Sequence, residues 1–145
     1  MLNNQLKFWN IDYEDLNYNN IFSSILGFTG SPGWFRIREH LLKYFGNFDG
    51  LKSIELGCGL GKLSVVLNTL GIETTLLDFN LTAIESAKKV HEFFECNSKF
   101  ICSDALEVEY VSGKFDISLS VGTAEYFTGE NRRKYIFNHI RVLKP

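Results

Sequence analysis

The feature that most constrains the fold is a pattern that repeats from Gly50 onward, in which a short apolar run precedes a turn and a helix with one apolar stripe. This alternation is typical of βαβ units. The expected strands are Ser53–Leu56, Ile72–Leu77, Lys99–Cys102 and Phe115–Val121. Because crossovers of this length make neighbouring strands parallel and right-handed, we expect an α/β fold: an open, doubly wound sheet with helices on both faces.

The segments between these strands carry apolar residues at helical spacing. One stripe consists of Leu63, Val66, Leu67 and Leu70. A second helix, for which Asn80 is a suitable N-cap, has its stripe at Ala83, Ala87, Val90 and Phe94. A last helix is expected from about Glu130 to Leu143, lined by Ile136, Ile140 and Leu143.

The first 50 residues do not follow this pattern. Asn and aromatic residues are frequent up to Gly30, and a helix is expected there from about Tyr13 to Leu26. Ser31-Pro32 is a good helix start, because Ser caps the helix and Pro at the first position loses no hydrogen bond. This second helix closes at Gly46, and its apolar face is expected at Trp34, Ile37, Leu41 and Tyr44. We therefore divide the chain into a helical segment, residues 1–50, and an α/β core, residues 51–145.

Composition disfavours several classes of protein. A chain of 145 residues, 45% of them hydrophobic, can bury a core without disulfides or metals. Its apolar stretches are far shorter than the roughly 18 residues of a membrane span, and its net charge of -2 gives no field for nucleic acid. Three cysteines without a C-x-x-C pair predict reduced thiols and no metal site. We expect a cytoplasmic protein with neither membrane nor nucleic acid as partner.

Chemistry is expected just after each strand, because ligands of such sheets bind beyond the carboxyl ends of the strands. The first strand runs into Glu55–Gly61, an E-x-G-x-G-x-G run in which glycines permit positive φ and close approach of a ligand. Dinucleotide-binding loops usually carry G-x-G-x-x-G, which would need glycine where this chain has Lys62. The run therefore favours a nucleoside other than a dinucleotide, and it disfavours a nicotinamide-dependent dehydrogenase.

Acidic side chains follow the second and third strands. Asp78 suits acceptance of hydrogen bonds from two ribose hydroxyls, and Phe79 could cover one face of an adenine ring. Asp104, in Ser103-Asp104-Ala105, could accept from an exocyclic amine of the base. The fourth strand opens into the loop Ser120–Tyr126.

At these positions the sequence resembles the class I S-adenosylmethionine-dependent methyltransferases, in particular those that act on small molecules. The resemblance covers about Lys52 to Pro145. It rests on Ile54–Gly61, Leu77–Asn80, Ser103–Ala105, Phe115–Ser120 with Glu125, and Arg141–Pro145, which occur in the family's order and at family-like spacing. It implies a Rossmann-like sheet in the order 3-2-1-4 and S-adenosyl-L-methionine as cofactor.

The resemblance also implies a set of site residues. Cofactor contacts are expected from Glu55, Gly57, Cys58, Gly59, Gly61, Asp78, Phe79, Asp104, Ala105, Ser120 and Val121. Phe79 and Ala105 would enclose the adenine, and Glu55 or backbone carbonyls would lie near the ammonium group. Glu125 is the candidate catalytic residue, which would orient or deprotonate the substrate; the alternative is that it only begins a turn. The aromatic N-terminal segment is expected either to pack on the sheet or to form a lid over the cofactor, and we favour the lid.

Several residues are kept outside the site, and a second function stays open. Asp116 is expected to face a helix terminus or solvent, and the three histidines are expected to be structural or solvated. Cys58, one of the cofactor contacts, is expected to act through packing and not as a nucleophile. Members of the family normally continue past Leu-Lys-Pro, so the sequence predicts an incomplete domain with Phe115–Val121 as an open edge. A second copy or a partner would cover that edge, and the alternative function is a non-catalytic module that binds S-adenosylmethionine or a partner.

Overall fold

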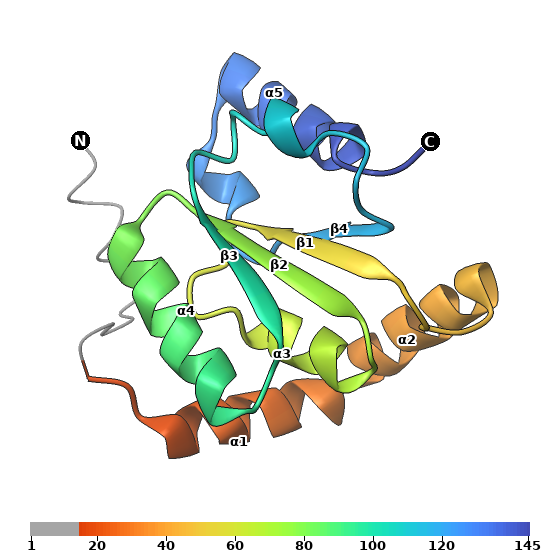
Figure 1. The fold of residues 1–145 in the computed structure, drawn as a ribbon, viewed down its shortest axis with the longest axis vertical. Helices are drawn as coiled ribbons and strands as arrows, with labels where there is room; N and C mark the ends of the chain where they lie inside the picture. Colours follow the sequence, from red (N-terminus) through yellow and green to blue (C-terminus); the bar gives the residue numbers. More distant parts are fainter. Residues whose placement is uncertain (1–14) are drawn as a thin grey trace.

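A four-stranded parallel sheet forms the centre of the computed structural model, which describes residues 15–145 (Figure 1). Its strands are β1 (Lys52–Leu56), β2 (Glu73–Asp78), β3 (Ser98–Cys102) and β4 (Ile117–Leu119). They lie in the order β3-β2-β1-β4, and every neighbouring pair is parallel. The predicted α/β fold and strand order are therefore confirmed.

The fourth strand is shorter than predicted. It pairs with β1 only from Ile117 to Leu119, in register with Ser53 to Glu55. Phe115 instead forms an isolated parallel bridge with Leu143, and its amide donates to the carbonyl of Val142 at 3.0 Å. The chain on the N-terminal side of β4 is thus drawn toward the segment that follows the last helix.

Within residues 15–145, five helices surround the sheet. They are α1 (Tyr18–Thr29), α2 (Pro32–Phe45), α3 (Lys62–Thr69), α4 (Leu81–Phe93) and α5 (Gly129–Arg141), and two short 3-10 turns are η3 (Glu109–Val111) and η4 (Ala124–Tyr126). The side chains of Asn17, Ser31 and Asn80 cap α1, α2 and α4, as their residue types favour. The first helix begins at Tyr18 because Asn17 accepts from the Asn20 amide, and it continues beyond the predicted end; Tyr13 lies outside the described residues.

Successive residues of β2 point to opposite faces of the sheet and pack in different hydrophobic clusters. Leu76 packs with Ile84 and Ala87 of α4 on one face. Leu77 packs on the other face, in a cluster that includes Val108 and Tyr135. Figure 1 shows α5 on one side of the sheet and α3 and α4 on the other, with α1 beyond α3. Helices on both faces confirm the doubly wound arrangement.

The predicted apolar face of α5 is wrong. Ile136 and Ile140 are 53% and 64% exposed, whereas Tyr135 and Asn138 are buried against the sheet. The Nδ2 group of the buried Asn138 side chain donates to the carbonyl of Ala105. The side of α5 that carries Tyr135 and Asn138 therefore faces the sheet.

The predicted face of α2 is only partly correct. Trp34 is buried and Leu41 is half-buried, but Ile37 and Tyr44 are exposed. Trp34 and Leu41 pack into the cluster shared with α1 and α3. The helix thus contacts the rest of the fold through a narrower stripe than its sequence predicts.

Neither a membrane-spanning helix nor a metal-binding cluster is present within residues 15–145. No helix in that range is long and apolar enough to cross a membrane. The same residues contain no group of three or more His, Cys, Asp or Glu side chains that is arranged to hold a metal ion.

Candidate functional site

The four loops that leave the carboxyl ends of the strands lie at one edge of the sheet, because all four strands are parallel. β1 leads into Gly57–Gly61, β2 into Phe79, β3 into Ser103–Ala105, and β4 into Ser120–Glu125. The structure thus brings the sequence-predicted residues to the same edge. Strand order reverses between β1 and β4, which is where open α/β sheets bind their ligands.

Asp78 holds the glycine loop and the start of α4 at the same time. Its Oδ2 accepts from the Gly59 amide at 3.0 Å and its Oδ1 accepts from the Asn80 amide at 3.0 Å. The amides of Gly57 and Cys58 both donate to the Leu77 carbonyl, at 2.8 and 3.0 Å. Asp78 is 8% exposed. Since a carboxylate oxygen has two lone pairs, each oxygen of Asp78 can still accept one further hydrogen bond.

Two glycines of the loop are required by the protein's own packing. Gly57 and Gly61 have φ of +76° and +68°, a backbone conformation that residues other than glycine rarely adopt. A Cβ at Gly57 would collide with the side chain of Thr123, whose hydroxyl donates to the Gly57 carbonyl at 3.1 Å. A Cβ at Gly61 would collide with Leu76 and His91. Sequence reasoning assigned these glycines to the approach of a ligand and missed Thr123, although it lies in the predicted loop after the fourth strand.

Glu55 is a buried carboxyl at the base of the loop. Its Oε2 accepts from the hydroxyl and the amide of Ser64, at 2.5 and 3.2 Å. Burial raises the pKa of Glu55 to about 7, against the lowering effect of both Ser64 hydrogen bonds. Burial, reinforced by Glu55, also raises the pKa of the Cys58 thiol, which therefore stays protonated. The inert thiol agrees with the packing role expected for Cys58.

The predicted adenine contacts differ in exposure. Phe79 is 59% exposed and Val121 is 60% exposed, so both offer open apolar surface beside the loops. Ala105 is buried in the cluster on the α5 face. Asp104 is exposed, and its Oδ1 accepts from the Leu106 amide at 2.8 Å, which holds the turn in which it lies. Ser120 is half-buried.

The candidate catalytic residue Glu125 is exposed in η4, where it faces solvent. Its neighbour Tyr126 has a buried hydroxyl with no hydrogen-bond partner among residues 15–145. Burial, and then the charge of Glu125, raise the pKa of Tyr126. This phenol is therefore a neutral hydrogen-bond donor beside the loop that follows β4.

Asp116 is tied into the fold and does not face solvent freely. Its two oxygens accept from Lys144 Nζ at 2.7 and 2.8 Å, and Oδ2 also accepts from the Lys52 amide at 2.8 Å. Burial alone would raise the pKa of Asp116, but these hydrogen bonds outweigh it and lower the pKa. Asp116 thus joins the start of β1 to the segment after α5 and lies outside the site, as expected.

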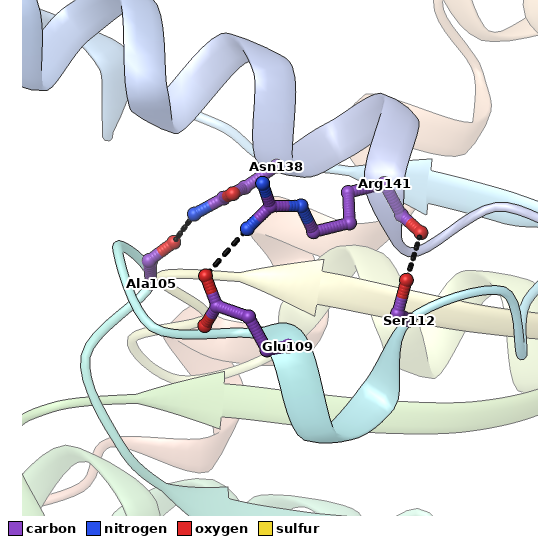
Figure 2. A network of polar contacts seen from close by, with 5 residues as sticks. All are labelled: Ala105, Glu109, Ser112, Asn138 and Arg141. Atoms are coloured by element: carbon purple, nitrogen blue, oxygen red, sulfur yellow. Dashed lines mark hydrogen bonds and ion pairs between the residues drawn. The ribbon is translucent and has the colours of Figure 1, made fainter.

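Helix α5 anchors two of the site loops. Tyr135 donates to the carbonyl of Leu56 at 2.9 Å, at the point where β1 ends. Asn138 donates to the carbonyl of Ala105 at 2.9 Å, in the loop after β3 (Figure 2). One turn further on, Arg141 pairs with Glu109 at 2.5 Å and its carbonyl accepts from Ser112 at 3.1 Å. Sequence reasoning missed Tyr135 and Asn138, although with Val142 they follow the i, i+3, i+7 spacing of a buried face.

The strand order and the helices on both faces define a Rossmann-like α/β domain. A model of the family described as "Methyltransferase domain" matches residues 54–145. The chain therefore belongs to this methyltransferase family, as the resemblance of its motifs predicts. No curated protein matches the sequence.

Solved structures show the same fold. The chain is similar to PH0226 protein from Pyrococcus horikoshii OT3, with 25% identity, a TM-score of 0.65, and coverage of 81% of this chain and 53% of that one. It is also similar to a chain from a study of the conversion of a disulfide bond into a thioacetal group during echinomycin biosynthesis, with 28% identity, a TM-score of 0.62, and coverage of 72% and 44%. PKMT2 from Rickettsia typhi, in complex with AdoHcy, shares the fold at 24% identity, a TM-score of 0.58, and coverage of 66% and 19%. The chain thus spans about half the length of the first two proteins.

Proposed function

We propose that this chain binds S-adenosylmethionine at the carboxyl edge of its sheet and takes part in methyl transfer to a small-molecule acceptor. The observation that carries the proposal is the arrangement around Asp78. A buried carboxylate that already orders the glycine loop stands next to Phe79, an exposed aromatic ring. The match to a methyltransferase family over residues 54–145 supports the same function.

The donor set suits the chemical groups of this cofactor. Asp78 has acceptor capacity left for ribose hydroxyls, and Asp104 is an exposed acceptor for the base amine. Phe79 would cover one face of the adenine, with Ala105 behind it and Val121 and Ser120 at the rim. Gly57, Cys58, Gly59 and Gly61 would line the methionine part, with the Glu55 carboxyl beneath them. We assign these residues to binding.

The chain's contribution to transfer would be proximity and alignment. When bound, S-adenosylmethionine supplies a methyl carbon that its sulfonium activates for attack by a nucleophile. The loops would fix the direction of approach and exclude water from it. Glu125 is exposed beside the loop after β4, where it could orient the acceptor or take its proton. We therefore keep Glu125 as the candidate catalytic residue.

The class of acceptor is inferred from charge and from one similar protein. A net charge of -2 provides no broad positive surface for a nucleic acid. The similar chain from echinomycin biosynthesis comes from a biosynthetic reaction, which is in keeping with a metabolite as acceptor. The three cysteines are free thiols, in keeping with the cytoplasm as the proposed compartment.

Calorimetric titration of the chain with S-adenosylmethionine, S-adenosylhomocysteine and NAD tests the proposal. We expect both sulfur nucleosides to bind and NAD not to bind. Phe79→Ala should weaken binding roughly tenfold, because loss of an aromatic contact of about 1 to 1.5 kcal/mol corresponds to that factor. Phe93→Ala is the matched control, since Phe93 is 55% exposed at the other end of α4. Binding of NAD alone, or equal affinities in the two variants, would contradict the assignment.

A further inference from the structure

A chain of hydrogen bonds reaches the glycine loop from the end of α4. His91, in the last turn of that helix, is 1% exposed. Its Nε2 lies 3.0 Å from the carbonyl oxygen of Gly61, and its Nδ1 lies 2.8 Å from the hydroxyl of Ser98 at the start of β3. The Ser98 hydroxyl lies 2.6 Å from the hydroxyl of Thr74 on β2. This chain of hydrogen bonds thus joins four segments of the fold.

The partners determine where the protons of this chain lie. A carbonyl oxygen only accepts hydrogen bonds, so Nε2 of His91 must carry the proton and donate to Gly61. In a neutral ring Nδ1 then accepts from the Ser98 hydroxyl, which leaves the Ser98 oxygen free to accept from Thr74. Burial lowers the pKa of His91, against the raising effect of the Gly61 hydrogen bond, in agreement with a neutral ring.

Gly61 is the residue at which the loop becomes a helix. It is the N-cap of α3 and has a left-handed backbone, and as a glycine it has no side chain to cap the helix. Its amide donates to the Cys58 carbonyl at 2.8 Å, and its carbonyl accepts from Val65 at 3.0 Å in addition to His91. The imidazole also occupies the space that a Cβ at Gly61 would need. His91 therefore fixes the peptide that sets the direction of the loop and of the first amides of α3.

We propose that His91 is a positioning residue of the cofactor site, which acts through the Gly61 carbonyl and does not touch the cofactor. The proposal rests on the proposed function, because it assigns the fixed loop to binding of S-adenosylmethionine. The Ser98 and Thr74 hydroxyls select the tautomer that donates to the loop. The site is thereby held from beneath by residues that belong to none of its four loops.

Two variants separate this role from simple filling of space. His91→Leu occupies the same region without a donor, whereas His91→Gln keeps an amide N–H that can reach the Gly61 carbonyl. Ile72→Ala is the stability control, because Ile72 is 1% exposed and precedes β2 at the opposite edge of the sheet. Hydrogen exchange of peptides that cover Glu55–Val65 reports on the loop without any ligand, and titration with S-adenosylhomocysteine reports on binding.

We expect His91→Leu to accelerate exchange in Glu55–Val65 and to weaken S-adenosylhomocysteine binding, each by roughly tenfold, the equivalent of one buried hydrogen bond. His91→Gln should restore most of the protection from exchange and most of the affinity for S-adenosylhomocysteine. Ile72→Ala should lower the midpoint of unfolding without changing loop exchange or binding. Loop exchange in His91→Leu that equals the wild type would overturn the proposal. So would a loop effect of the same size in Ile72→Ala.

Nitrogen NMR of the wild-type imidazole gives a test that does not depend on how the variants fold. The neutral tautomer protonated at Nε2 is expected at pH 7, and the tautomer protonated at Nδ1 would overturn the proposal. If the wild type fails to bind S-adenosylhomocysteine, the proposed function is wrong. Loop exchange and the tautomer would then still decide whether His91 holds Gly61.

Discussion

At the scale of single residues, Glu55 couples the stability of the fold to pH. The carboxyl is 3% exposed and its pKa is raised from 4.5 to about 7. Between these two pH values the folded chain holds a proton that the unfolded chain has released, so the free energy of unfolding falls as the pH rises. The contribution is fully present below pH 4.5 and is lost as the pH passes 7. A shift of this size corresponds to about 3 kcal/mol.

Glu55→Gln should remove this dependence, because an amide has no proton to lose in that range. We expect the free energy of unfolding of the variant, measured relative to the wild type with urea, to increase by about 3 kcal/mol between pH 4.5 and pH 8. Glu92→Gln, on the exposed side of α4, is the control and should parallel the wild type. If the free energies of unfolding of Glu55→Gln and the wild type depended on pH in the same way, the pKa of the folded Glu55 carboxyl would not be raised, which would contradict the prediction.

A second prediction at this scale concerns the contact between Gly57 and Thr123. Gly57→Ala places a methyl group against the Thr123 side chain at φ +76°, and we expect a loss of about 2 to 4 kcal/mol from backbone strain and overpacking. Thr123→Ala removes the two side-chain atoms nearest to that methyl, so the double variant should recover part of the loss. Chemical denaturation of all four chains gives the coupling energy. Additive losses would mean that the loop moves away from Thr123 without cost.

At the scale of secondary-structure elements, α5 stabilises two loops of the site through hydrogen bonds from its side chains. Tyr135→Phe deletes one hydroxyl and leaves the Leu56 carbonyl without that donor. We expect a loss of about 1 kcal/mol in the free energy of unfolding, the typical value of such a hydrogen bond. Tyr110→Phe, at a tyrosine that is 50% exposed, should change the free energy of unfolding by much less. Equal losses of stability in the two variants would contradict a specific contribution of the Tyr135 hydrogen bond.

The elements also show what the sequence alone could predict. Local signals were sufficient for the existence of the four strands, for the caps at Ser31 and Asn80, and for the loops that carry Asp78 and Asp104, because alternation and capping depend on near neighbours. The strand order was predicted from the resemblance to the methyltransferases. The face of α5 was predicted wrongly because Asn138 finds its partner 33 residues away. The hydrogen bond from His91 to Gly61 spans 30 residues and has no local signal either. Contacts of this kind depend on how elements pack, which periodicity does not encode.

At the scale of the whole molecule, apolar surface remains open beside one edge of the sheet. Ile136, Phe137 and Ile140 of α5 are each more than half exposed. Within residues 15–145, β4 is an edge strand that pairs with β1 alone over Ile117–Leu119. An unpaired edge next to exposed apolar side chains favours association with another chain.

We therefore expect the chain to self-associate in a concentration-dependent way, and Ile140→Lys to reduce this association. Tyr44→Lys is the matched control, because Tyr44 is a large aromatic residue on α2 that is 83% exposed. Sedimentation velocity over a range of concentrations measures both variants against the wild type. A monomer at all concentrations, or equal effects of the two changes, would contradict a role for α5 in association.

The packing of Thr123 on Gly57, and of Leu76 and His91 on Gly61, has a consequence for the evolution of such chains. Selection for a stable loop alone would preserve these two glycines in a descendant that no longer uses a cofactor. The glycine spacing of the loop would then persist after the ancestral activity is lost. An exposed position such as Phe79 is free of that packing constraint, so it should diverge first when binding is lost. It is therefore the better marker for recognising inactive members of the family from their sequences.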